Sequence, residues 1–119
     1  MYFLQQGVYS SEESMKKNTT DFQDYIYEVK EGKYYVYVGM TKLEENAEKI
    51  KEYYKKKGYV LYRKELPIRG TNFLNSLNEY DELLKNTEDE KACLNICKQV
   101  LNQYKELVLN GTNENEGTT

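Results

Sequence analysis

The sequence predicts an α+β fold: a β-α-β-β-α-β unit with a four-stranded antiparallel sheet and two helices on one face, followed by a C-terminal helical hairpin. Segments 4–14 and 36–46 repeat one pattern, in which an apolar strand ends at a glycine and a helix then begins at hydroxyl and acidic residues. Glu31-Gly32 separates two runs rich in Tyr and Val, which indicates a β-hairpin. After Pro67 the apolar residues follow a helical period, which predicts the hairpin of helices.

The first repeat is predicted to hold a strand through Leu4 and Val8 and a short helix from Ser11 to about Thr20. Ser10 and Glu13 have the spacing of a capping box, so we expect Ser10 to cap this helix. A strand over 22–29 follows.

The second repeat has the stronger pattern. A strand is expected over 34–40, and Thr41 with Glu44 again has capping-box spacing. Gly58 is expected to end the helix, and a last strand is expected over 59–64. The helix carries one apolar stripe, formed by Leu43, Ala47, Ile50 and Tyr54.

Two further helices are expected after a break at Arg69-Gly70. The first begins behind Thr71 or Asn72, and the second behind a capping box of Thr87 and Glu90. Their apolar stripes are Phe73, Leu77, Tyr80 and Leu84, and then Ala92, Cys93, Ile96, Val100, Tyr104 and Leu107. We therefore expect a domain at 1–66, a helical hairpin packed on it at 67–109, and a disordered tail at 110–119.

The charge balance and the hydropathy of the chain argue against two classes of protein, nucleic-acid binders and membrane-spanning proteins. The chain has 17 basic and 20 acidic residues, a balance that argues against nucleic-acid binding. It contains no run near the ~20 apolar residues needed to cross a bilayer. No signal peptide is expected, because the N-terminus runs directly into a strand. Any membrane anchor would lie outside this sequence.

The residue types for catalysis are sparse. The sequence has no His, the commonest general base and metal ligand. Cys93 and Cys97 have no partners for a zinc site and are expected to be small buried residues. We therefore expect no enzyme activity, no metal and no cofactor.

One face of the predicted sheet carries a candidate binding site. The first and third strands of this arrangement are central, and alternate side chains point to opposite faces. With Leu4 and Val8 pointing toward the helices, the opposite face would hold Phe3, Gln5, Gly7, Tyr35 and Tyr37. An amide among aromatic rings suits carbohydrate recognition. Alternatively, the C-terminal helices cover this face and these residues belong to the core.

Five short motifs carry a family resemblance. They are Gln5-Gln6-Gly7-Val8-Tyr9, Glu13-Ser14-Met15, Tyr35-Val36-Tyr37-Val38-Gly39, Glu45-Asn46-Ala47 and Lys57-Gly58-Tyr59. In order and spacing, over residues 1–66, they resemble the sporulation-related repeat (SPOR) domains, whose sheet has the same strand order as RNP-type domains. The Lys-, Asn- and Tyr-rich composition is typical of Firmicutes-like chains.

The resemblance implies a non-catalytic module that binds the glycan strands of peptidoglycan through its open sheet face. Gln5 would be the family's glycan-binding glutamine, with Tyr35 and Tyr37 in the groove. It also implies a protein of the cell envelope or of sporulation, tethered outside the cytoplasmic or forespore membrane; a cytoplasmic location stays open. Two alternatives remain: a SPOR-like module that binds an envelope or sporulation protein without binding glycan, and a binder of single-stranded nucleic acid, which the charge balance disfavours.

Overall fold

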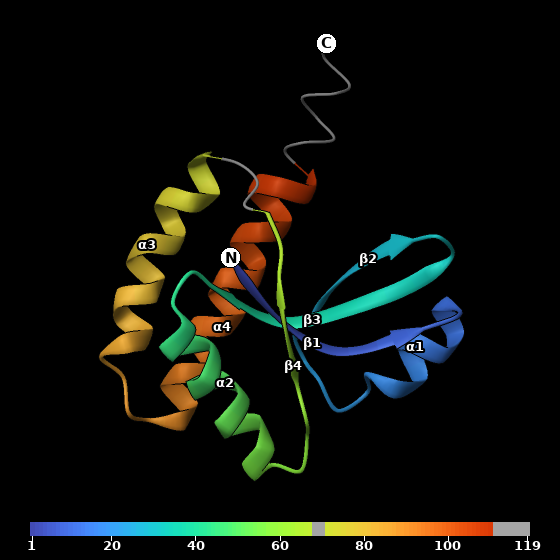
Figure 1. Ribbon diagram of the computed structural model, residues 1–119, viewed down its shortest axis with the longest axis horizontal. Coiled ribbons are helices and arrows are strands. Elements are labelled where there is room, and N and C mark those ends of the chain that lie inside the picture. Colours follow the sequence, from blue (N-terminus) through green and yellow to red (C-terminus); the bar gives the residue numbers. More distant parts are fainter. Residues whose placement is uncertain (68–70, 111–119) are drawn as a thin grey trace.

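The computed structural model describes residues 1–67 and 71–110 and has an α+β fold with a four-stranded antiparallel sheet and four helices (Figure 1). The expected break at Arg69-Gly70 and residues 111–119 of the expected tail lie outside this part. The elements are β1 (Tyr2–Tyr9), α1 (Glu12–Asn18), β2 (Ile26–Lys30), β3 (Lys33–Thr41), α2 (Glu44–Lys56), β4 (Tyr62–Glu65), α3 (Thr71–Lys85), α4 (Glu90–Tyr104) and the π-helical turn η1 (Lys105–Asn110).

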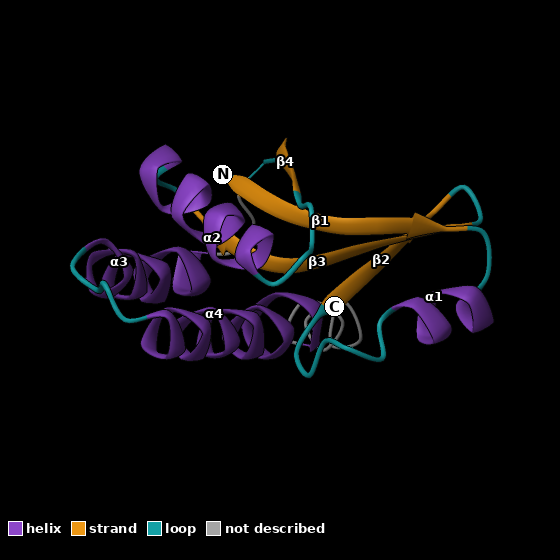
Figure 2. Cartoon of the chain, turned by 90° about the horizontal axis from the view of Figure 1, so that it is seen from below, coloured by secondary structure: helices purple, strands orange, loops and turns teal. Residues whose placement is uncertain are grey.

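The strands are ordered β2-β3-β1-β4, so β1 and β3 are central and β2 and β4 are the edges. The expected turn joins β2 to β3, with Glu31 and Gly32 at φ values of 52° and 77°. Two such residues form the tight turn that matches the twist of a hairpin. The β2–β3 hairpin extends away from α2, α3 and α4 (Figures 1 and 2).

Two irregularities interrupt the pairing of β1 with β3 on either side of Gln5. An extra residue in one strand reverses the alternation of side chains beyond it. Val8, which was expected to point into the core with Leu4, is therefore opposite Tyr35 and 39% exposed. Leu4 itself is fully buried, as expected.

Helices pack against both faces of the sheet where β1 and β3 meet. Leu4 pairs with Gly39, and a methyl group added to Gly39 would lie 3.5 Å from Ile50 of α2. Phe3, the neighbour of Leu4, points to the opposite face, where its ring lies 5.8 Å from that of Tyr104 in α4. The C-terminal helices therefore cover part of the face that was expected to be open, which is the alternative raised above.

Two strands are shorter than expected because their first aromatic residues pack elsewhere. Phe22 precedes β2 and is buried, with its ring 5.7 Å from Tyr54 and 4.8 Å from Tyr59. Tyr59 precedes β4, and its hydroxyl donates a hydrogen bond to Asp21 at 3.0 Å. These contacts hold the loop before β2 against the end of α2.

Two helix caps differ from the expected residues by one or two positions. Ser11, rather than Ser10, caps α1 by accepting a hydrogen bond from the Ser14 N–H at 3.1 Å. Asp89, rather than Thr87, caps α4 by accepting from the Ala92 N–H at 3.2 Å. In both places several neighbouring residues have cap chemistry, so spacing alone did not select the right one.

The start of α2 is organised by Asp81, a residue of α3. The expected cap Thr41 does not cap α2, whose N-cap Leu43 has no side-chain cap bond. Instead the Thr41 hydroxyl donates to Asp81 at 2.6 Å, and the Lys42 N–H donates to the same carboxylate at 3.0 Å. Asn46 of α2 donates to the backbone carbonyl of Asp81 at 3.0 Å. Burial raises the pKa of Asp81 despite these hydrogen bonds, so its carboxylate holds the end of β3 against α3 at an electrostatic cost.

We predict that Asp81→Ala lowers the free energy of unfolding by roughly 1–3 kcal/mol, because it leaves the buried Thr41 hydroxyl and Lys42 N–H without their acceptor. Chemical denaturation with two probes measures this. Glu79→Ala, on an exposed position of the same helix, is the control and should change stability by less than about 0.5 kcal/mol. Equal losses in both variants would contradict the role given to Asp81.

Candidate functional site

The predicted aromatic platform lies inside the protein. Phe3 and Tyr37 are each 2% exposed, and their rings contact edge to face with centroids 5.1 Å apart. Tyr104 packs on Phe3, and Phe73 of α3 packs on Tyr104 with centroids 5.2 Å apart. The prediction that Phe3 and Tyr37 are exposed is therefore wrong, because α4 places the Tyr104 ring against Phe3, with Phe73 of α3 packed behind it.

Polar groups around this ring cluster are also held within the protein. The Tyr104 hydroxyl donates a hydrogen bond to Glu28 of β2 at 3.1 Å. Burial, with smaller contributions from the nearby Glu28 and Tyr35, raises the pKa of Tyr37 to about 12. Tyr37 is therefore a neutral core phenol over the physiological range.

The other three predicted site residues have different surroundings. Gln5 is 7% exposed and pairs with Tyr37 in the sheet register, and its buried Oε1 has no hydrogen-bond partner among the described residues. A side chain at Gly7 would clash with the phenol of Tyr9, so this glycine makes room for that ring. Tyr35 is half-buried. The five residues therefore form no continuous exposed platform.

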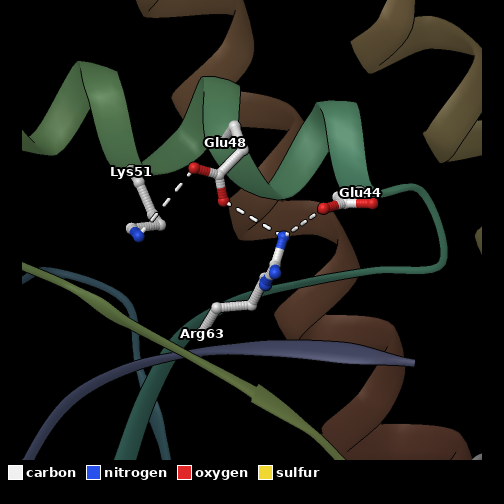
Figure 3. Close-up of polar contacts among 4 residues, drawn as sticks. All are labelled: Glu44, Glu48, Lys51 and Arg63. Carbon is white, nitrogen blue, oxygen red and sulfur yellow. Dashed lines mark hydrogen bonds and ion pairs between the residues drawn. The ribbon is translucent and has the colours of Figure 1, made fainter.

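A polar groove lies between β4 and α2. It is lined by Gln5, Glu44, Glu48, Lys51, Tyr62, Arg63 and Lys64. Arg63 lies 3.0 Å from Glu44 and 3.3 Å from Glu48, and Lys51 lies 3.9 Å from the other oxygen of Glu48 (Figure 3). These opposite charges are already paired with one another, and the ion pairs connect the short edge strand β4 to α2.

The other edge strand, β2, is less protected. Within the described residues its backbone pairs only with β3. Tyr27 and Val29 are 41% and 54% exposed and lie on the same face of the strand. The ring of Tyr34, on β3, lies 5.8 Å from that of Tyr27. An apolar row of this kind on an open edge is a template for adding another strand.

Sequence reasoning did not single out Tyr27 and Val29. The signal was present, because the predicted strand order already made the second strand an edge. An edge strand is normally short, charged or interrupted, whereas Tyr25-Ile26-Tyr27-Glu28-Val29 is mostly apolar. The combination of edge position and apolar content distinguishes this strand from β4, which is Tyr62-Arg63-Lys64-Glu65.

No family model matches the chain, and neither the curated proteins nor the solved structures give a match. Among the described residues, none of the helices has the length and apolar content to cross a bilayer.

Cys93 and Cys97 are buried free cysteines, as expected. A hydrogen bond to Cys93 and burial raise the pKa of Cys97, which keeps it a thiol.

We predict that Phe3→Ala lowers the free energy of unfolding by roughly 3–5 kcal/mol, because the ring is enclosed by Tyr37 and Tyr104. Tyr62→Ala, at a site 59% exposed, should cost less than about 0.5 kcal/mol. Thermal and urea unfolding measure both. If Phe3→Ala were as harmless as Tyr62→Ala, the ring would lie on an open face.

Proposed function

We propose that this chain is a non-catalytic protein-interaction module with a SPOR-like fold that acts in a cell-envelope or sporulation complex. The observation that carries the proposal is the position of the aromatic residues. The rings that a glycan would stack on are packed under α3 and α4, while Tyr27 and Val29 are exposed on the open edge strand β2. An open edge with apolar side chains is a common surface for binding another polypeptide.

The SPOR-like part of this proposal is supported by the order of elements in residues 1–66. A strand–helix–strand unit occurs twice, and the first and third strands are adjacent at the centre of the sheet. The α3–α4 hairpin is an addition to this unit, and it covers part of the sheet face that the resemblance assigns to glycan binding. The envelope or sporulation setting rests on the sequence motifs alone.

Glycan binding is a second candidate, and one observation favours it. Gln5, the residue that the resemblance assigns to glycan, lines the groove beside β4 and has a buried side-chain oxygen without a partner. Tyr62, in the same groove, has an exposed ring that a sugar could cover. In this version the glycan would bind the groove at the sheet edge rather than the sheet face.

The interaction proposal predicts that a photo-crosslinking side chain placed at Tyr27 gives one dominant protein adduct in cells that produce the chain. The same group at Leu83, an exposed position on α3, is the control and should give none. Adduct formation is measured by gel shift and mass spectrometry. Equal labelling at both positions, or no adduct at Tyr27, would contradict a partner on β2.

The two candidates also differ in sedimentation with purified peptidoglycan. If the protein-interaction proposal holds, the chain stays in the supernatant with sacculi stripped of stem peptides. Pelleting that is lost in Tyr62→Ala, with Tyr27→Ala as the matched aromatic control, would instead establish glycan binding at the groove. A circular dichroism spectrum unchanged from wild type verifies that each variant is folded.

A further inference from the structure

We propose that β2 binds an extended segment of its partner as a fifth, antiparallel strand, and that this segment carries a basic residue opposite Glu28 with apolar residues on both sides. This inference rests on the proposed interaction function and specifies the chemistry of the partner. Its evidence is the backbone geometry of β2, the charges along it, and the surface that continues past its first residue.

Within the part of the chain that the structure describes, the backbone of β2 has unpaired donors and acceptors at alternate residues. In a hairpin with a two-residue turn, the residues that flank the turn, Lys30 and Lys33, exchange both backbone hydrogen bonds. Counting back by two, Glu28 and Ile26 also direct their backbone groups toward β3. The N–H and C=O groups of Tyr27 and Val29 therefore point outward from the sheet, where they are available to an added strand.

The side chains at this edge favour a partner with a specific pattern. Residues opposite Tyr27 and Val29 would share their face and bury apolar surface against them. The residue between these two would lie opposite Glu28, whose side chain is 12% exposed, lies 3.6 Å from Lys30 and accepts the hydrogen bond of the Tyr104 hydroxyl. A lysine or arginine there would pair with the carboxylate, whereas an acidic residue would be repelled.

A second copy of this chain fits the edge poorly. The self-pairing that uses both Tyr27 and Val29 places each opposite the other, and this register puts Glu28 directly against Glu28 of the second copy. Like charges at directly opposite positions destabilise a strand pair. A register shifted by two residues pairs Glu28 with Lys30 but moves Tyr27 opposite Glu31 in the turn. Charge at the centre of β2 therefore selects a different polypeptide.

The edge continues into a groove beside η1. This groove is lined by Gln23, Tyr25, Ile26, Tyr27, Lys105 and Leu109. An antiparallel segment running along β2 would reach it two or three residues after its basic residue. An aliphatic side chain at that point of the partner would contact Tyr25 and Leu109. From its N-terminal to its C-terminal end, the partner segment therefore carries an apolar, a basic, an apolar and an aliphatic residue in succession.

A synthetic hexapeptide, Thr-Val-Lys-Val-Leu-Thr with blocked ends, tests this pattern against the ¹⁵N-labelled protein. We expect saturable chemical-shift changes centred on the amides of Tyr27 and Val29, and slowed exchange of both amide hydrogens. A peptide with glutamate in place of lysine should bind roughly two- to fivefold more weakly. Shifts that map to β4, or equal binding of the two peptides, would overturn the proposal.

Val29→Pro removes the outward N–H without breaking a bond to β3, since proline is tolerated at an edge position whose N–H faces solvent. It should abolish peptide binding, whereas Val29→Thr, which keeps the N–H, should retain it. A dimer in sedimentation velocity that Val29→Pro dissolves would make a second copy the occupant and overturn the peptide pattern. If the two peptides bind equally but the crosslink at Tyr27 still forms, the peptide pattern is wrong and the proposed interaction function is retained.

Discussion

The contact between Phe3 of β1 and Tyr104 of α4 determines which surface of this sheet a ligand can reach. It joins the first strand to the last long helix, and Tyr37 and Phe73 extend it on both sides. Because aromatic residues bury large areas and prefer these edge-to-face contacts, the cluster holds the C-terminal helices against the sheet. Exposing the rings again would require α3 and α4 to separate from the sheet, so their surface is unavailable to a ligand in the folded protein.

A second set of contacts makes that arrangement rigid. Asp81 of α3 holds the end of β3 and accepts a hydrogen bond from Asn46 of α2 at its backbone carbonyl. Lys49 of α2 donates to the carbonyls of Leu84, Lys85 and Thr87 at the end of α3. A cation at this position satisfies carbonyl groups that have no partner within the helix. Because α2 is tied to α3 at both points, the hairpin is an integral part of the core and not a removable lid.

The sequence predicted most of the elements but not which surface stays open. Strand and helix positions follow from local periodicity, so the repeated unit, the Glu31-Gly32 turn and the C-terminal helices could be predicted. The exposure of Phe3 and Tyr37 depends on Tyr104, which lies about a hundred residues from Phe3 in the chain, and local patterns do not encode such contacts. Val8 was assigned to the wrong face because the irregularities around Gln5 leave no signature in the pattern of apolar residues.

The two edges of the sheet show how one fold can direct its interactions. β4 is short and charged, and Arg63 is tied to Glu44 and Glu48 of α2, so another strand would have to compete with ion pairs. β2 is mostly apolar, and its one acidic residue, Glu28, lies where it opposes self-pairing. Covering the central face and protecting one edge leaves β2 as the open strand within the described residues, and in the proposed interaction the charge on that strand disfavours a second copy. Specificity in such a module therefore arises as much from the surfaces it blocks as from the one it offers.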